Sequence, residues 1–251
     1  MSTRPGFFEA EVLSRTALSE HLVRIVLGGS GLTSFAGTGL PDEWVALVVP
    51  GQFQSRYYTV RSWTGAELTL DIVVHDEGLV TEWAMTECVG DVISVSEPKG
   101  SYLPAQDASW VVLLGDLTAL PAIARIREAS TDIVHAFVSS ADGPIPGYSD
   151  GVTWLPGDVE LAAFVESFAW PPGDGYFWMA GESAQMRQIR RHVRRELGWD
   201  ASRQDLMGYW SNTRARQSRA VDPGPIYRRG KAQGLTDEEI WAAYDEEVGR
   251  A

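Results

Sequence analysis

The sequence predicts an antiparallel β-barrel domain, then an α/β domain with a parallel sheet, then a C-terminal helical tail. The apolar pattern changes its period near residue 105. Before this point, short alternating segments are separated by Gly, Pro and Asp, which is typical of an antiparallel barrel or sandwich. After it, apolar strands alternate with helical segments, which favours a parallel sheet covered by helices. The predicted boundaries are 1–105 for the barrel domain, 106–212 for the α/β domain and 213–251 for the tail.

The strands of the first domain are short segments with a period of two. One segment, 79–87, has no helix breaker and places Leu79, Trp83 and Ala84 on one side, so it predicts a short helix. The predicted strands are 22–27, 44–49, 54–63, 67–75 and 91–97.

The second domain alternates apolar strands with amphipathic helices. Its predicted strands are 110–115, 133–139, 152–155, 176–180 and 205–210, and its predicted helices are 118–129, 158–169 and 183–197. If the first and fourth strands are neighbours in a 3-2-1-4-5 sheet, the point where the winding order reverses lies between them. Ligands bind at that point in open α/β sheets.

The charge balance excludes some partners. The chain of 251 residues has 21 basic and 34 acidic side chains, a net charge of −13. Nucleic acids and anionic membranes attract basic surfaces, so we expect neither as a partner and no membrane insertion. The acidic excess lies in the two domains, whereas the tail is neutral overall. Within the tail, 213–231 is a basic arm, and a capping box at 236–239 begins an amphipathic helix.

The single cysteine, Cys88, limits the redox chemistry. An iron–sulfur cluster needs about four thiolates, and no metal site is expected from the scattered histidines. Redox chemistry must therefore come from a bound organic cofactor or from a metal that the substrate brings. The N-terminus lacks the apolar core of a signal peptide, so we expect a cytoplasmic protein.

The run Arg56-Tyr57-Tyr58-Thr59-Val60-Arg61 lies on a predicted barrel strand. A flavin needs an aromatic face against its ring, a small polar group near its polar edge and a cation for its pyrophosphate. Tyr, Thr and Arg side chains can supply these three contacts. The alternative is an ordinary barrel strand with surface arginines.

Two further places are typical of phosphate or nucleotide binding. Gly78 lies between the strand that ends at His75 and a helix start, where free N–H groups suit a pyrophosphate. The alternative here is a plain helix cap. The strand ends Gly115-Asp116 and Gly181-Glu182 let a dinucleotide approach the backbone, with Thr118 capping its helix; the alternative is two ordinary strand–helix turns.

Together these segments resemble the siderophore-interacting protein family, the flavin-dependent ferric-siderophore reductases, which are related to ferredoxin–NADP reductases. The resemblance spans about residues 9–212. It rests on the R-x-Y-T-x-R run, DIVVHDEGLVTEWA, GDVISVSEPKGSY, GDLTALPAIARI, WMAGESAQMRQIRRHVRRELG and GYW.

The resemblance implies an FAD-binding barrel and an NAD(P)H-binding α/β domain of the ferredoxin-reductase-like fold, with NADPH or NADH as the electron donor. It assigns these residues to FAD: Arg56, Tyr58, Thr59, His75, Gly78, Leu79, Val80 and Thr81. It assigns these residues to the nicotinamide site: Asp116, Thr118, Gly181, Glu182, Tyr209 and Trp210. The chain departs from the family pattern at Leu117, where an acid is usual, and at Ser211, where a basic residue is usual.

The expected activity is transfer of electrons from NAD(P)H, or from ferredoxin, through FAD to the Fe(III) of a siderophore, releasing Fe(II). No catalytic acid or base is expected, because electron transfer needs none. Lysines are scarce, so we expect Arg61, Arg214, Arg216 and Lys231 to contact the anionic ferric siderophore. The alternatives are a flavin reductase or electron carrier of the same fold with another acceptor, and a non-catalytic siderophore-binding module.

Overall fold

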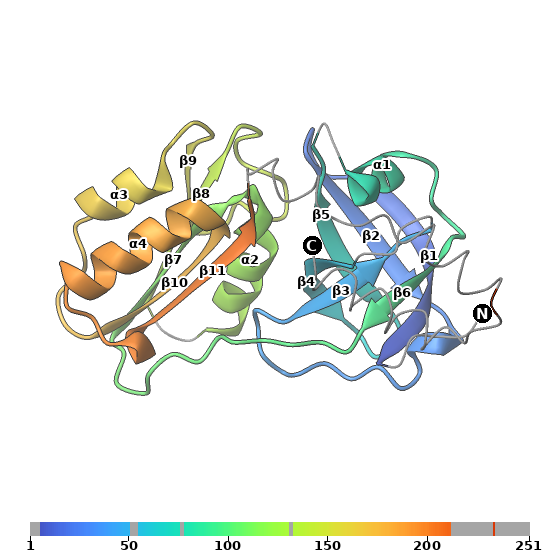
Figure 1. The fold of residues 1–251 in the computed structure, drawn as a ribbon, viewed down its shortest axis with the longest axis horizontal. Helices are drawn as coiled ribbons and strands as arrows, with labels where there is room; N and C mark the ends of the chain where they lie inside the picture. Colours follow the sequence, from blue (N-terminus) through green and yellow to red (C-terminus); the bar gives the residue numbers. More distant parts are fainter. Residues whose placement is uncertain (1–5, 51–54, 76–77, 131–132, 212–232, 234–251) are drawn as a thin grey trace. The chain divides into compact units, whose positions relative to one another are not determined.

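The computed structural model describes residues 6–50, 55–75, 78–130, 133–211 and 233, and the strands of these residues form two sheets (Figure 1). The first sheet is a closed barrel with the strand order β1-β2-β5-β4-β3-β6 and antiparallel pairings. Its strands are β1 (Phe7–Ala17), β2 (Leu22–Gly28), β3 (Trp44–Val48), β4 (Arg56–Trp63), β5 (Leu68–Val73) and β6 (Val92–Ser96).

The second sheet is parallel, with the order β11-β10-β7-β8-β9. Its strands are β7 (Trp110–Asp116), β8 (Val134–Ser140), β9 (Val152–Pro156), β10 (Gly175–Glu182) and β11 (Gln204–Trp210). In order along the chain this is the 3-2-1-4-5 arrangement that the sequence predicts. The carboxyl ends of β7 and β10 are therefore neighbours at the point where the winding order reverses.

Helices cover both faces of the parallel sheet (Figure 1). One face packs against α2, whose Ile123 and Ile126 are fully buried, and the other against α3 and α4. The helices are α1 (Leu79–Met85), α2 (Leu120–Ala129), α3 (Leu161–Ser167) and α4 (Ser183–Arg195), with 3₁₀ turns η1 (Ser30–Leu32), η2 (Leu117–Ala119) and η3 (Ala201–Arg203). The predicted fold class is confirmed. The predicted tail helix lies outside the described residues.

Strand β1 is missing from the sequence-based prediction. Only Ala10 and Val12 are buried along its 11 residues, so the strand lacks the long apolar alternation that marks the others. The register between β1 and β2 also shifts between Val12 and Ser14. Such a β-bulge breaks the period of two that sequence patterns rely on.

The barrel and the parallel sheet share one compact unit, Phe8–Ser211. Leu22 of the barrel is fully buried in the same apolar cluster as α2 and the strands of the parallel sheet. A buried carboxylate reinforces this contact: Asp71 of the barrel accepts two hydrogen bonds of 2.7 Å from Arg24 of the barrel and a third from the Tyr148 hydroxyl of the β8–β9 connection. The two sheets therefore meet along a contact that is both apolar and polar.

A second polar contact joins the β1–β2 turn to the β8–β9 connection. The Asp142 carboxylate accepts hydrogen bonds from the Ser19 hydroxyl and the His21 amide, and its other oxygen lies 2.6 Å from His21 Nδ1. Glu20 brings a third possible ligand atom, and all three lie within 4.8 Å of one another. Nδ1 of the His21 ring is paired with Asp142.

The only cysteine of the chain lies in the barrel core. Cys88 has no exposed surface, and it packs among the apolar side chains of the barrel. Burial raises the pKa of its thiol above the ordinary value. The thiol is therefore held protonated and away from solvent, as expected for a structural cysteine.

Among the described residues, no helix has both the length and the apolar character that crossing a membrane requires.

Candidate functional site

Strand β4 places Tyr58 and Thr59 on opposite faces of the barrel wall. Tyr58 is half-buried against the barrel core, and its burial raises the pKa of its phenol, an effect that the nearby Arg56 charge partly opposes. Arg56 is exposed. An aromatic ring and a cation are thus adjacent on the same strand, as the sequence predicts for a flavin site.

The hydroxyl of Thr59 is buried and has no hydrogen-bond partner within the described residues. Thr59 lies opposite Trp44 of β3. The phenol of Tyr209 lies near it and also lacks a hydrogen-bond partner of good geometry in the described part of the chain. Burial raises the pKa of Tyr209, and the Thr59 hydroxyl is close enough to oppose the rise.

This unpaired hydroxyl tests whether the site fits a flavin. A buried polar group without a partner costs about 1–3 kcal/mol, so proteins keep such groups where a ligand completes them. The polar edge of an isoalloxazine ring offers both donors and acceptors to a hydroxyl. The residues of β4 therefore fit FAD.

The segment before α1 is the second place that the sequence predicts to contact FAD. Gly78 has a φ of +132°, a conformation that L side chains rarely adopt, and a Cβ there would lie 3.4 Å from Cε1 of His75. The N-cap residue of α1, Gly78, has no side chain that could cap the helix. Within the described residues, the first turn, Leu79, Val80 and Thr81, therefore begins with backbone N–H groups that its own N-cap side chain does not satisfy. The preceding acids, Asp76 and Glu77, lie outside the described residues.

The carboxyl ends of β7 and β10 form a tight polar corner. Gly115 and Gly181 allow this closeness: a Cβ on Gly115 would lie 2.7 Å from the Ala180 carbonyl oxygen, and one on Gly181 would lie 2.9 Å from Asp116 Oδ2. Asp116 Oδ1 accepts hydrogen bonds from the Thr118 amide at 2.9 Å and from the Thr118 hydroxyl. Its Oδ2 accepts a bond of 2.7 Å from the Trp210 indole.

Burial raises the pKa of Asp116, although the hydrogen bonds from Thr118 and Trp210 oppose the rise. Glu182 is bonded in a similar way. Its Oε2 accepts from the amides of Ala184 and Gln185, at 2.7 and 2.9 Å, and so caps α4. At both strand ends, a carboxylate of the chain itself already occupies the helix start.

The arginine predicted to contact the siderophore is engaged in the protein. Both Nη atoms of Arg61 donate to the Glu128 carboxylate of α2, at 2.9 and 2.6 Å. Its guanidinium also lies 5.3 Å from the ring centroid of Tyr148. A role for Arg61 in substrate contact stays a prediction that requires the pair with Glu128 to open. The other predicted contacts, Arg214, Arg216 and Lys231, lie outside the described residues.

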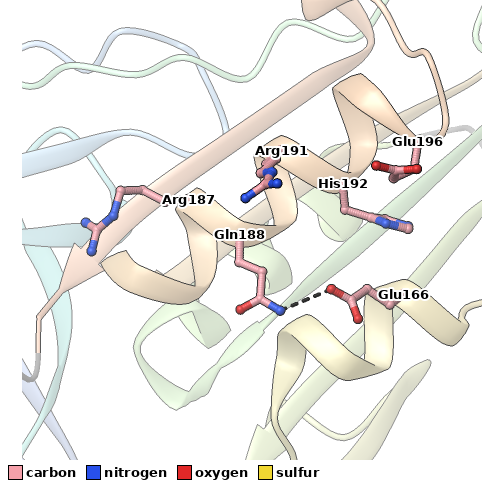
Figure 2. A pocket seen from close by; sticks show the side chains of 6 residues that line it. All are labelled: Glu166, Arg187, Gln188, Arg191, His192 and Glu196. Carbon is pink, nitrogen blue, oxygen red and sulfur yellow. Dashed lines mark hydrogen bonds between the residues drawn. The ribbon is translucent and has the colours of Figure 1, made fainter.

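A polar hollow lies on the outer side of α3 and α4 (Figure 2). Gln188 of α4 donates a hydrogen bond of 3.1 Å to Glu166 of α3 across it. In Figure 2, Arg187 points away from this pair. The hollow mixes both signs of charge, as is typical of a solvated helix face. Its lining residues are Glu166, Arg187, Gln188, Arg191, His192 and Glu196.

Sequence reasoning missed Arg125 and Glu128, two residues of α2 that face β4. Arg125 Nη1 donates 2.7 Å to the Val60 carbonyl and lies 3.2 Å from Glu43 Oε1. The spacing of three residues between Arg125 and Glu128, which puts them on one helix face, was the available signal. That signal does not say which strand the face meets.

Comparison with known proteins identifies the family. Residues 108–213 match the model described as the siderophore-interacting protein, and residues 51–102 match the siderophore-interacting FAD-binding domain. An uncharacterized protein of Mycobacterium tuberculosis is 31% identical, covering 82% of this chain and 91% of its own. The NADPH-dependent ferric-chelate reductase of Escherichia coli is 27% identical, covering 81% of this chain and 92% of its own.

Solved structures agree with these matches. The siderophore-interacting protein of Aeromonas hydrophila has a TM-score of 0.70 and 26% identity, covering 84% of this chain and 94% of its own. The fold alone is shared with a ferredoxin–NADP reductase of Neisseria gonorrhoeae, at a TM-score of 0.65 and 13% identity, covering 82% of this chain and all of its own. The chain therefore belongs to the siderophore-interacting protein family, with that family's FAD-binding domain.

Proposed function

We propose that this FAD-dependent oxidoreductase reduces ferric siderophores in the cytoplasm, with electrons that come from NAD(P)H, and releases Fe(II). The observation that carries the proposal is the buried, unpaired Thr59 hydroxyl on the strand of the R-x-Y-T-x-R run. It supports a resident flavin rather than an ordinary barrel strand. The ferric-chelate reductase of Escherichia coli supports the choice of acceptor and of NADPH as a donor.

The chain's residues have binding and positioning roles in this proposal. Tyr58 would pack against the ring of FAD, Thr59 would hydrogen-bond its polar edge, and Arg56 with the amides of 79–81 would hold its pyrophosphate. His75 and Gly78 would shape the turn beside it. When bound, FAD supplies the exchange between a two-electron donor and a one-electron acceptor. The protein needs no acid or base for this exchange.

The nicotinamide site would lie at the carboxyl ends of β7 and β10. Trp210, Tyr209 and Asp116 would close over the ring and exclude water, and Thr118, Gly181 and Glu182 would border the nucleotide. One NAD(P)H gives two electrons and a proton in becoming NAD(P)⁺, so each donor reduces two Fe(III) to two Fe(II). Fe(II) then leaves the chelate because oxygen-rich chelators bind the harder Fe(III) far better.

The first experiment separates this enzyme from a binding module. Purified protein should carry or take up FAD, and under anaerobic conditions the flavin absorbance should bleach on mixing with NADPH or NADH. Reduced ferredoxin is the third donor to compare. Protein that does not bind added FAD would refute the proposal, and protein whose FAD no donor reduces would leave only a binding module.

The second experiment identifies the acceptor. Reduced protein is mixed with ferric siderophores in the presence of a colorimetric Fe(II) chelator. We expect two Fe(II) per oxidised NAD(P)H. If donor oxidation proceeds at the same rate with and without the chelate, the protein is a flavin reductase with another acceptor.

A further inference from the structure

The backbone of β4 is irregular beside Thr59. Val60 pairs with Leu70 of β5 and Ser62 pairs with Thr69, so Arg61 is the extra residue of a β-bulge. The Val60 amide donates 2.9 Å to the Glu43 carbonyl. Bulges bend a strand and re-aim its side chains. The direction of the Thr59 side chain therefore depends on what holds this bulge.

A buried ion pair holds one side of the bulge. Arg125 of α2 donates to the Val60 carbonyl and lies against Glu43, whose side chain is 2% exposed. The other oxygen of Glu43 accepts from the Thr38 amide at 2.7 Å and the Thr38 hydroxyl at 2.8 Å. Every partner of Arg125 in this group is thus fixed by another hydrogen bond.

The same helix holds the other side of the bulge. Glu128, one turn along α2 from Arg125, accepts both Nη atoms of Arg61. Helix α2 therefore forms two ion pairs with the barrel: its Arg125 pairs with Glu43, and its Glu128 pairs with Arg61. The contacts of α2 hold the consecutive residues Val60 and Arg61, and Thr59 is the residue directly before them.

We propose that Arg125 is a positioning residue for FAD: by holding the Val60 carbonyl it keeps the Thr59 hydroxyl directed at the polar edge of the flavin. This inference rests on the proposed function, because it assumes that Thr59 contacts the cofactor. It goes beyond that function by assigning a role to a residue of the other domain. Helix α2 follows directly on η2 at the nucleotide corner, so one element borders both halves of the site.

The test is a double-mutant cycle in FAD affinity, measured by titration of the apoprotein with FAD followed by flavin fluorescence. Thr59→Val removes the hydroxyl. Arg125→Met removes the guanidinium, and combining it with Glu43→Gln avoids leaving a buried charge unpaired. We expect about tenfold weaker FAD binding for each change, the effect of one lost hydrogen bond to the ligand.

The two effects should not add when Thr59→Val is placed on the Arg125→Met/Glu43→Gln background, because both act on the same contact. Arg125→Lys keeps a donor at Val60 and should restore most of the affinity. Arg127→Met is the matched control, since Arg127 lies on the same helix but donates to the Asp150 carbonyl. Thermal melts of all variants, read by circular dichroism, confirm that each protein is folded.

The outcomes separate the inference from the proposed function. If the wild-type protein does not bind FAD, the proposed function fails. If Thr59→Val weakens FAD binding but the Arg125 variants bind as the wild type does, only the inference fails. Additive effects in the cycle would likewise show that Arg125 acts independently of Thr59, and would overturn the positioning role.

Discussion

The barrel half and the sheet half of the candidate site differ in whether their buried polar groups are hydrogen-bonded within the chain. On the barrel, the Thr59 hydroxyl is buried without a partner in the described chain. On the sheet, the carboxylates of Asp116 and Glu182 are each bonded to groups of the chain itself. A site with an unpaired buried hydroxyl suits a cofactor that remains bound. A site whose polar groups are already hydrogen-bonded to the chain suits a ligand that enters by displacing those hydrogen bonds.

The largest expected effect concerns the contact that holds the two halves together. Asp71→Asn should lower the free energy of unfolding by about 3 kcal/mol, because it breaks a buried ion pair and leaves Arg24 without its carboxylate. Chemical denaturation measures this loss. The control is Glu128→Gln, which breaks a pair whose carboxylate side chain is 56% exposed and should cost under about 1 kcal/mol. Equal losses would show that the exposed pair matters as much.

The next largest expected effect comes from removing the hydrogen bonds of Asp116 in the sheet half. Asp116→Ala removes the acceptor of the Trp210 indole and of two Thr118 groups, so the free energy of unfolding of the apoprotein should fall by about 2 kcal/mol. Asp200→Ala is the matched control, since Asp200 accepts from the Ser202 amide and hydroxyl in the same way at an exposed turn. If both variants lose equally little, the sheet half is not closed by Asp116.

In the barrel half, a substitution should raise rather than lower the free energy of unfolding of the apoprotein. Thr59→Val replaces an unpaired hydroxyl with a methyl group, so the apoprotein should gain up to about 1 kcal/mol while its FAD affinity falls. Thr38→Val is the contrast, because it removes a hydroxyl that is bonded to Glu43 and should destabilise the apoprotein. A loss of apoprotein stability in Thr59→Val would contradict the description of Thr59 as unpaired.

The smallest effect is a pH dependence where β11 meets the barrel. The Ser101 hydroxyl lies 2.6 Å from Asp205 Oδ2 and 2.9 Å from Asp42 Oδ2. Burial and the Asp42 charge raise the pKa of Asp205, although the Ser101 hydroxyl opposes the rise. A carboxyl whose folded pKa is raised contributes stability below its unfolded pKa of about 4 and loses it as pH rises through the folded pKa.

Asp205→Asn should therefore show a smaller decline in unfolding free energy between about pH 4 and neutrality than the wild type, by about 1 kcal/mol or less. Denaturation at several pH values measures the difference. Asp107→Asn serves as the comparison, because hydrogen bonding to Arg203 lowers the pKa of Asp107 and its effect has the opposite sign. Identical pH profiles for the wild type and Asp205→Asn would contradict the prediction.

The two domains differed in how far sequence reasoning reached. The 3-2-1-4-5 order followed from continuous apolar strands that alternate with helices, because parallel sheets leave few other arrangements. Strand β1 could not be found, because few of its side chains face the core. Tyr58 and Thr59 could be singled out because the roles predicted for them follow from local residue types alone. Arg61 could not be placed, because its partner, Glu128, lies 67 residues away on a helix of the other domain.

The buried thiol of Cys88 makes this chain suitable for site-specific labelling at introduced cysteines. Because it is the only cysteine and has no exposed surface, a cysteine introduced at an exposed position would be the single site that reacts with a thiol-directed label. A pair of such labels, one on the barrel and one on the sheet, would report their separation by electron spin resonance. Spectra recorded with and without NAD(P)H would then show directly whether the donor moves one domain against the other.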